Sequence, residues 1–199
     1  SAPFAGRGMS ADWIYGHWFS RPAAGCTTNC ILRWPATGGA PTVLGASQPA
    51  GSSSIVAKGQ YAAWLNGNSI TIHDAQAGTF DGIVIRTAGR GVISFDFAVV
   101  GGAPLFYYWV GGGAGVPTQD VSLFRWTEAT DEELVTAFDD TDTSIFNPQV
   151  AVDGQYVAYN AWTPPSGGSP ATVTTVVRPV SGGSPTTIGG APRDLAMMD

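Results

Sequence analysis

The chain has 199 residues, of which 44% are hydrophobic and only 12% charged, and its formal net charge is −6 at pH 7. One ordinary domain is expected at this length, and the 7 Trp, 6 Tyr and 9 Phe exclude intrinsic disorder. An acidic chain with a single lysine, Lys58, is a poor nucleic-acid binder, and the absence of any run of 18 apolar residues predicts no membrane-spanning segment.

The first predicted repeat covers about residues 5–50 and sets the pattern for the rest of the chain. Its first strand is expected at Ala5–Ala11, and its second strand, near residues 13–19, carries a pair of aromatic residues. A loop leads to a third strand with the basic residue Arg33, and a glycine turn at Gly38 leads to a fourth. Short runs of β-branched and aromatic residues separated by Gly, Pro and Ser are typical of strands.

The loop of the first repeat contains the only two cysteines, Cys26 and Cys30. Two ligands cannot close a structural zinc site, and the two histidines of the chain, His17 and His73, lack ligand spacing. The loop is rich in turn residues, where free thiols would be exposed and reactive. We therefore predict a Cys26–Cys30 disulfide that pins the loop and forms in an oxidising compartment. The alternative is two free thiols in a cytosolic loop.

The pattern returns three times, over about residues 51–92, 93–143 and 144–192. Each repeat carries an aromatic–x–x–aromatic pair, and the pairs are Tyr15/Trp18, Tyr61/Trp64, Phe106/Trp109 and Tyr156/Tyr159. The first aromatic residues of successive pairs are 46, 45 and 50 residues apart. The later aromatic strands are expected near residues 60–66, 104–110 and 155–162. All four should occupy the same place in successive sheets, with both aromatic side chains largely buried.

A basic residue marks the third strand of every repeat, at Arg33, His73, Arg125 and Arg178. This shared position favours a structural role for His73, and His17 is interpreted as a packed or rim histidine rather than a catalytic base. The tryptophans at 18, 64 and 109 are interpreted as packing residues rather than as sugar-stacking platforms. Catalytic motifs of the Gly-x-Ser-x-Gly, His-Glu-x-x-His and phosphate-loop types are absent from the sequence.

Acidic residues gather in the third repeat. Glycoside hydrolysis needs two facing carboxylates, whereas Glu128, Glu132 and Glu133 cluster in one segment and are interpreted as a solvated acidic turn. The surrounding segment 127–138 contains helix formers, but its alignment with the other repeats predicts a β-turn followed by a strand. The sequence therefore predicts no catalytic residue and no cofactor.

A run of aspartates follows this segment. Asp139, Asp140 and Asp142 offer oxygen ligands of the kind that Ca²⁺ prefers. The run lacks the glycine and the terminal glutamate of a standard calcium loop. The sequence leaves open whether these residues bind Ca²⁺, and no metal site is predicted.

The last residues match the beginning of a repeat. Arg193–Asp199 aligns with Asn147–Asp153, so Arg193–Met198 is expected to be the first strand of a fifth repeat. A sheet edge left open there would be one that proteins avoid. We expect it to be covered by a longer chain or by strands from another chain.

Four antiparallel strands in about 45 residues are typical of a propeller blade. The sequence thus predicts an all-β protein, a β-propeller of four four-stranded antiparallel blades plus the start of a fifth. A β-sandwich also has a strand every 8–12 residues or so, but it has no reason to repeat two motifs in register four times.

The fourth repeat resembles that of TolB-type, WD40-like β-propellers. The resemblance rests on Asn147–Tyr159 and Val173–Gly183, with the Asp-Gly turn of that family at positions 153 and 154. The second repeat has Lys58-Gly59 at this turn, and the first and third repeats depart from it with Asp12-Trp13 and Ala103-Pro104. The resemblance implies architecture and carries over no active site.

These observations favour a non-catalytic, extracellular or periplasmic propeller that binds a protein partner or serves in assembly. A second hypothesis is the propeller part of a secreted carbohydrate-active enzyme or peptidase whose catalytic residues lie elsewhere. A third is a carbohydrate-binding lectin. An enzyme needs converging carboxylates or a Ser/His pair, a lectin needs exposed aromatic side chains at equivalent rim positions, and a scaffold needs a broad face buried against another chain.

Overall fold

In the computed structural model, the described residues form sixteen strands in four four-stranded antiparallel sheets, without a helix. The described residues are 4–10, 12–18, 30–46, 55–66, 69–77, 83–86, 91–111, 120–127, 130–139, 149–163, 169–170 and 172–189. Their side chains are described too, except at 4–8, 17–18, 45–46, 83–86, 120, 130–139 and 162–163. Among these residues no helix is long and apolar enough to cross a membrane.

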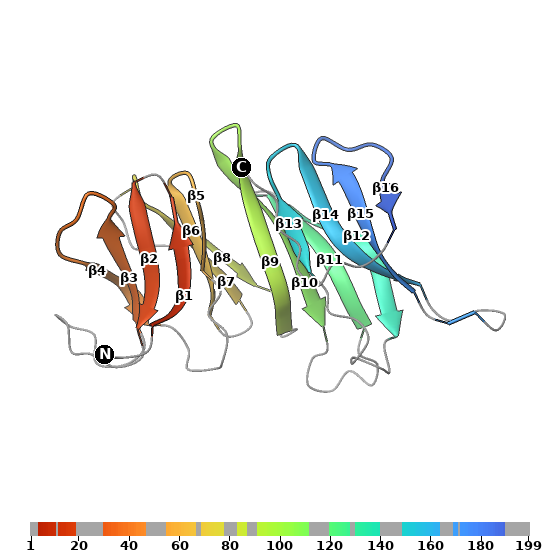
Figure 1. Cartoon of the computed structure of the whole chain (residues 1–199), viewed down its shortest axis with the longest axis horizontal. Coiled ribbons are helices and arrows are strands. Elements are labelled where there is room, and N and C mark those ends of the chain that lie inside the picture. Colours follow the sequence, from red (N-terminus) through yellow and green to blue (C-terminus); the bar gives the residue numbers. More distant parts are fainter. Residues whose placement is uncertain are drawn as a thin grey trace. The chain divides into compact units, whose positions relative to one another are not determined.

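Each sheet consists of four strands that follow one another in the sequence and pair in that order (Figure 1). Sheet A contains β1 (Phe4–Met9), β2 (Trp13–Trp18), β3 (Cys30–Pro35) and β4 (Thr42–Ala46). Sheet B contains β5 (Ile55–Lys58), β6 (Tyr61–Asn66), β7 (Ser69–Asp74) and β8 (Ile83–Arg86). Sheet C contains β9 (Gly91–Val100), β10 (Ala103–Gly111), β11 (Asp120–Thr127) and β12 (Thr130–Asp139). Sheet D contains β13 (Val150–Val152), β14 (Tyr156–Thr163), β15 (Thr172–Pro179) and β16 (Thr186–Ile188).

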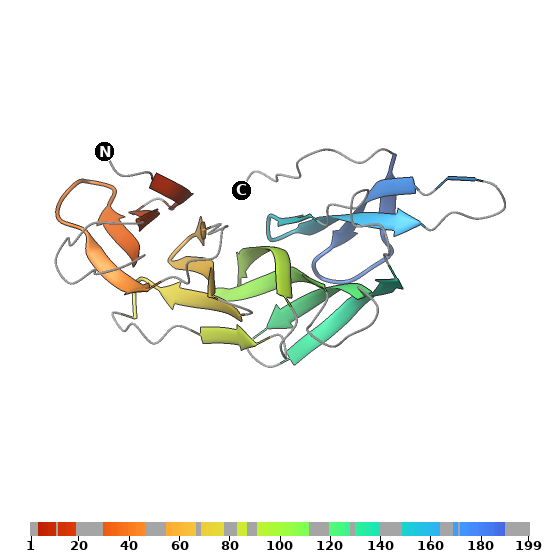
Figure 2. The same ribbon diagram turned by 90° about the horizontal axis from the view of Figure 1, so that it is seen from below.

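The chain divides into two compact units, each holding two sheets. The first unit, Ser1–Ala88, contains sheets A and B, and the second, Gly89–Asp199, contains sheets C and D. Figure 2 shows the sheets of the second unit as two layers, sheet C in green and sheet D in blue.

Glycines in the left-handed region form the hairpin turns between first and second strands. Gly101 and Gly102, between β9 and β10, have φ angles of 62° and 86°, as a type I′ turn requires. The corresponding turns of sheets B and D contain Gly59 (φ 56°) and Gly154 (φ 98°). Before Gly154, Oδ1 of Asp153 accepts hydrogen bonds at 2.8 Å from the backbone N–H groups of the next two residues after the glycine. The Asp-Gly pair of the fourth repeat is therefore a turn element, as the resemblance implied.

One backbone hydrogen bond recurs in three sheets and closes the hairpin of the second and third strands. The N–H just after the third strand donates to the carbonyl just before the second. The bond is 2.8 Å in each case, in the pairs Ala36–Asp12, Ala75–Gln60 and Val180–Gln155. Sheets A, B and D thus share a local geometry that matches the sequence repeat.

Sheets A and B enclose an apolar core between their facing sides. Its buried members are Tyr15, Ile31 and Leu44 from sheet A and Ile55, Ala62 and Trp64 from sheet B. Burial of each large side chain stabilises the fold by about 1.5–3 kcal/mol. The aromatic strands β2 and β6 each contribute to this layer, which holds the two sheets together.

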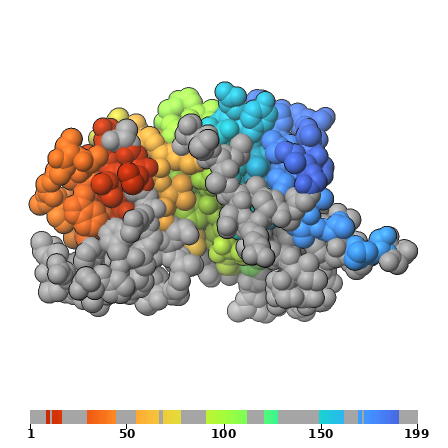
Figure 3. Space-filling model, in the orientation of Figure 1, coloured from red at the N-terminus to blue at the C-terminus, as the bar shows by residue number. Residues whose placement is uncertain are grey.

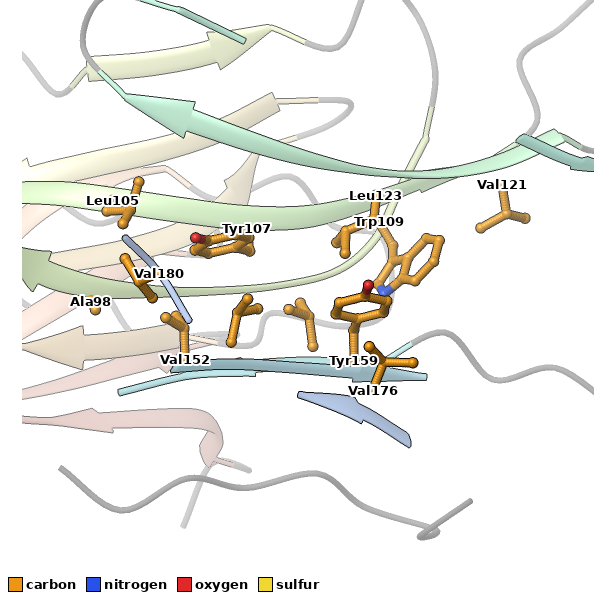
Figure 4. Packing of buried hydrophobic residues seen from close by; sticks show 12 residues of the cluster. Ala98, Leu105, Tyr107, Trp109, Val121, Leu123, Val152, Tyr159, Val176 and Val180 are labelled. Atoms are coloured by element: carbon orange, nitrogen blue, oxygen red, sulfur yellow. The ribbon is translucent and has the colours of Figure 1, made fainter. Parts of the chain in front are cut away.

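Sheets C and D enclose a larger core, in which side chains from the two sheets interdigitate (Figure 4). Trp109 on β10 is completely buried at its centre, and its ring meets that of Tyr159 edge to face at a centroid distance of 6.4 Å. The indole Nε1–H of Trp109 donates to the carbonyl oxygen of Gln149 at 3.1 Å. The other face of sheet C is aromatic as well, with Phe97 and Phe106 stacked at 4.8 Å.

The expected aromatic strands are confirmed as β2, β6, β10 and β14, each the second strand of its sheet. The expected burial holds for every described aromatic residue of the four pairs except Tyr156, for which it is wrong. Tyr156 is 44% exposed. Successive side chains on a strand point to opposite faces, and Val157 and Tyr159 pack against sheet C, so Tyr156 faces away from it.

Two further expectations concern the C-terminal half. The strand expected within 127–138 is confirmed as β12. Arg193–Met198, the expected start of a fifth repeat, lies outside the described residues.

Candidate functional site

A polar contact joins sheets A and B through Arg33 on β3 and His73 on β7. Nη1 of Arg33 lies 3.3 Å from Nε2 of His73 and 3.5 Å from the carbonyl oxygen of Ala75. The guanidinium carbon of Arg33 also lies 4.1 Å from the ring centroid of Trp13 on the neighbouring strand, a cation–π contact. Three groups therefore surround the charge of Arg33 at the edge of the apolar core.

This contact determines the protonation state of His73. An arginine has only N–H donors, so Nε2 of His73 accepts the hydrogen bond and the neutral ring carries its proton on Nδ1. Burial and the nearby charge of Arg33 lower the pKa of His73, while Asp74 acts in the opposite direction. His73 is only 3% exposed, so it ties the sheets together as a neutral acceptor, in agreement with a structural role.

Tyr15 lies beside this pair, directly opposite Arg33 in the register of β2 and β3. Burial raises the pKa of Tyr15 to about 12, although the charge of Arg33 acts in the other direction. The hydroxyl of Tyr15 and that of Thr71 on β7 are buried without a hydrogen-bond partner among the described residues.

The carboxylate of Asp74, next to His73, is used by a turn. Its Oδ1 accepts hydrogen bonds from the backbone N–H groups of Gln76 (2.8 Å) and Ala77 (3.3 Å). Its Oδ2 accepts one from Nε2 of Gln60 at 3.0 Å. A carboxylate that holds three donors is an anchor for the turn rather than a candidate acid or base.

Sheets C and D are joined by a hydrogen bond between their first strands. Oδ2 of Asp96 on β9 accepts a hydrogen bond of 2.8 Å from the backbone N–H of Val152 on β13. Its Oδ1 accepts another of 2.8 Å from the N–H of Phe97. Both carboxylate oxygens are therefore engaged, and the first strands of the two sheets are fixed against each other.

Two rows of residues run across the facing sides of sheets C and D. The row in sheet C is Asp96, Tyr107 and Arg125, and the row in sheet D is Val152, Val157 and Arg178. Directly opposite residues of antiparallel strands share a face, and Tyr107 and Val157 both belong to the core between the sheets. Figure 4 shows Tyr107 and Val152 reaching into this core from opposite sheets. Arg125 and Arg178 therefore lie on the facing sides, at corresponding positions of the two third strands.

The sequence repeat suggested that the four basic residues occupy one equivalent position. In the structure they do not. Arg33 and Arg125 face the sheet that follows in the chain, whereas His73 and Arg178 face the sheet that precedes. A shift of one residue in a strand moves a side chain to the other face. Arg33 lies opposite the first aromatic residue of its repeat, whereas the other three basic residues lie opposite the residue that follows it.

The structure describes the side chains of two of the three tryptophan candidates and of one of the two cysteines. Trp64 and Trp109 are 4% and 0% exposed, which confirms packing and excludes them as sugar-stacking platforms. The side chain of Trp18 lies outside the description. Cys30 begins β3 and is 4% exposed, but Cys26 lies outside the described residues, so the disulfide stays a prediction.

The acidic candidates lie largely outside the description. Glu132 and Glu133 belong to strand β12 rather than to a turn, and Asp139 is its last residue, but none of these side chains is described. Residues 128, 140 and 142 and the side chain of His17 also lie outside it. In the part of the chain whose side chains are described, no three His, Cys, Asp or Glu residues come together in a way that could hold a metal ion.

Sequence reasoning missed three features: the contact of Arg33 with His73, the tie made by Asp96, and the facing positions of Arg125 and Arg178. The signal that could have found the last of these is the face of the sheet on which each basic residue lies, since successive residues of a strand alternate between faces. Asp96 gave no signal, because nothing in its neighbourhood repeats.

Comparisons with known proteins support the fold. No protein-family model and no curated protein matches the chain. The solved structure of apo AztD from Citrobacter koseri matches 97% of this chain and 49% of its own, with 12% sequence identity and a TM-score of 0.56. A thermostable family-43 glycoside hydrolase matches 96% of this chain and 74% of its own, with 11% identity and a TM-score of 0.42.

The match to AztD, a β-propeller protein, shows that this all-β chain has the propeller type of architecture. At 12% identity the likeness concerns the fold alone, and the chain spans about half the length of AztD. The comparisons contain no feature specific to the TolB type.

Proposed function

We propose that this chain is a non-catalytic β-propeller module that binds a protein partner in the extracellular space or periplasm. The tip of the β9–β10 hairpin carries this proposal. Val99 and Val100 are 37% and 42% exposed, and a Cβ placed on Gly101 or Gly102 would meet nothing within 4 Å. Figure 3 shows the tip, in light green, standing at the surface.

The chemistry of this tip suits a protein contact. Residues 97–105 contain no charged side chain, and the flanking strands, of 10 and 9 residues, form a long ladder that holds the turn. Apolar side chains exposed on a rigid element are typical of protein-interaction sites. A preformed hairpin also loses little conformational entropy on binding.

The roles of the polar residues support binding over catalysis. Arg33 and His73 tie two sheets together, Asp74 anchors a turn, and both oxygens of Asp96 hold backbone N–H groups. Each of these groups is used to maintain the fold.

We further infer that the four sheets are four blades of one propeller and that Arg193–Met198 begins a fifth. The match to AztD over 97% of the chain and the pairing of consecutive strands in every sheet support this arrangement.

The predicted Cys26–Cys30 disulfide supports a location outside the cytoplasm. Mass spectrometry of the unreduced protein tests it, and two alkylated thiols would contradict it.

A photo-cross-linking amino acid at position 100 tests the proposed function. Irradiated in the presence of the secreted and periplasmic proteins of the source organism, it should give a discrete adduct. An excess of unlabelled wild type, added before irradiation, should prevent this adduct from forming, whereas an excess of the double variant Val99→Ser/Val100→Ser should not. The control position is Ser181, which lies in another exposed turn of the same unit. Identical products at both positions, or none, would overturn the proposed binding site. Hydrolysis of glycosides or peptides by the purified chain would overturn its non-catalytic character.

A further inference from the structure

The first sheet of the chain has an apolar face that points away from sheet B, which we call the outer face of sheet A. Ile14 and Trp34 lie on it, because Tyr15 in the same strand as Ile14 packs against sheet B and Trp34 is opposite Ile14. Met9 on β1 is opposite Ile14 and 67% exposed. The face also holds a small apolar cluster, made of Cys30, Leu32, Trp34 and Val43. Arg7, opposite Gly16, is the one charged residue that the register of the described strands places there.

The last sheet has a face of the same character, the outer face of sheet D, which points away from sheet C. Tyr156 lies on this face, since Val157 packs against sheet C. Ile188 on β16 is opposite Thr175, which is opposite Asn160 on β14, so Ile188 shares the face, and it is 53% exposed. Among the described residues that the register places on this face, none is charged.

The corresponding faces of sheets B and C differ from these two in burial. Tyr61 and Ile72 point away from sheet A and are buried, and Phe97 and Phe106 point away from sheet D and are completely buried. Tyr156 has the position of Tyr61 in its repeat, yet it is exposed. The outer faces of sheets A and D thus have the apolar chemistry of a buried face and leave large side chains in contact with solvent.

We propose that a second copy of this chain covers both outer faces, with sheet A of each copy packed against sheet D of the other. Apolar faces already hold sheet A to sheet B and sheet C to sheet D, so the contact between copies repeats the packing within each copy. When a two-fold axis relates the copies, this head-to-tail contact occurs twice and neither outer face stays open. Burial of Met9, Tyr156 and Ile188 would remove their apolar surface from water.

The length of a matching propeller favours a second copy as the occupant. The match covers 97% of this chain and 49% of AztD, so AztD is about twice as long, and two copies of this chain supply that length. Each copy also brings the face that the other needs. Among the described strands β1 pairs with β2 alone, so the β1 edge of the second copy can receive the strand inferred for Arg193–Met198.

Sedimentation equilibrium of the 199-residue chain over a dilution series tests the proposal. The wild type should have a mass of about twice 20.6 kDa. Met9→Glu on the outer face of sheet A and Ile188→Lys on that of sheet D should each raise the dissociation constant of the dimer roughly tenfold or more, because the contact would bury an unpaired charge. Both residues are exposed in the single chain, so the variants should fold like the wild type, which circular dichroism checks.

A mixture of the two variants separates head-to-tail packing from contacts between like sheets. The mixed pair keeps one unaltered contact, between the sheet A of Ile188→Lys and the sheet D of Met9→Glu, and its other contact contains opposite charges. The mixture should therefore associate more tightly than either variant alone. Fluorescent labelling of one variant measures this, and a mixture no tighter than the separate variants would contradict the pairing of sheet A with sheet D.

The matched control is Gln76→Glu, which adds a charge in an exposed turn and should leave the dissociation constant within about twofold. A wild type that stays at 20.6 kDa would overturn the proposal and is the result expected if further residues of a longer chain cover the faces. A mass that keeps rising with concentration would also overturn it, because the contact would then form an open chain. Val99→Ser/Val100→Ser should dimerise like the wild type, so that failure of the hairpin-tip proposal and failure of this one are distinguishable.

Discussion

The two pairs of sheets are held together by polar contacts between different strands. In the A–B pair the contact joins third strands, where Arg33 meets His73. In the C–D pair it joins first strands, where Asp96 binds the N–H of Val152. The register position of Asp96 in sheet A is Gly8, opposite Tyr15, and a glycine has no side chain with which to bind the next sheet.

The apolar layers of the two pairs are more alike than the polar contacts. Tyr15 and Tyr107 are both buried on the side of the sheet that follows, and each is opposite an arginine. Hydrophobic burial is non-directional and tolerates exchange of side chains, whereas a hydrogen bond needs a particular donor and acceptor. The comparison therefore indicates that apolar packing brings the sheets together. Polar contacts then align the two sheets of a pair, and the strands that make these contacts differ between the pairs.

The largest expected effect distinguishes the two cores. Trp109→Ala should lower the free energy of unfolding by about 3–5 kcal/mol, as deletion of a buried tryptophan does. Trp64→Ala in the A–B core should cost less, because Trp109 also loses its hydrogen bond to the carbonyl of Gln149. Urea denaturation followed by tryptophan fluorescence and circular dichroism measures both. The exposed Tyr156→Ala is the control, with an expected loss of about 1 kcal/mol or less, and a larger loss at Trp64 than at Trp109 would reverse this ranking.

Removal of the Asp96 carboxylate tests the contact between the first strands of sheets C and D. Asp96→Ala should cost about 2–3 kcal/mol, because a charged acceptor is lost from the N–H groups of Val152 and Phe97. Asp96→Asn keeps one carbonyl acceptor and should cost less. Urea denaturation of the three proteins at pH 7 measures the difference. Equal stability of Asp96→Ala and the wild type would show that the alignment of sheets C and D is independent of this carboxylate.

Acidification should weaken the contact between Arg33 and His73. The pKa of His73 is lowered in the folded protein, so below about pH 6.5 the unfolded chain takes up a proton that the folded protein resists. Stability should therefore fall as the pH drops through this value, until the folded pKa is passed. Unfolding free energies between pH 8 and 5 should show this loss in the wild type and a smaller loss in His73→Gln. His17→Gln is the control, and an unchanged pH dependence in His73→Gln would contradict the assignment.

The sequence predicted strand order well because the relevant signals are local. Aromatic strands such as β6 are bounded by turn residues such as Gly59, whose left-handed φ of 56° suits glycine. The burial of individual residues on these strands could not be predicted by the same means. Tyr156 matches Tyr61 in the sequence, yet it is 44% exposed while Tyr61 is 7% exposed. In each sheet the tyrosine is followed by a core residue, Ala62 or Val157, so the local pattern does not distinguish the two positions.

The polar contacts escaped prediction for a related reason. Arg33 and His73 are 40 residues apart, and a motif alignment placed them in one repeated position rather than opposite each other. Whether two such residues meet depends on the parity of each along its strand and on the face to which its sheet packs. A pairwise comparison of registers contains this information, whereas repeat spacing does not.

The smallest expected effect concerns the hydroxyl of Tyr15, which is buried without a partner among the described residues. Tyr15→Phe should leave the free energy of unfolding at pH 7 unchanged or raise it by up to about 1 kcal/mol, because an uncompensated polar group is removed. Since the pKa of Tyr15 is raised to about 12 from 10.0, ionisation of the unfolded chain should destabilise the wild type between these pH values and affect Tyr15→Phe less. Urea denaturation at pH 7 and 11 measures both effects, with the exposed Tyr156→Phe as the control. A loss of more than about 1 kcal/mol at pH 7 would show that the hydroxyl is bound to the guanidinium of Arg33, and the A–B contact would then extend across three side chains rather than two.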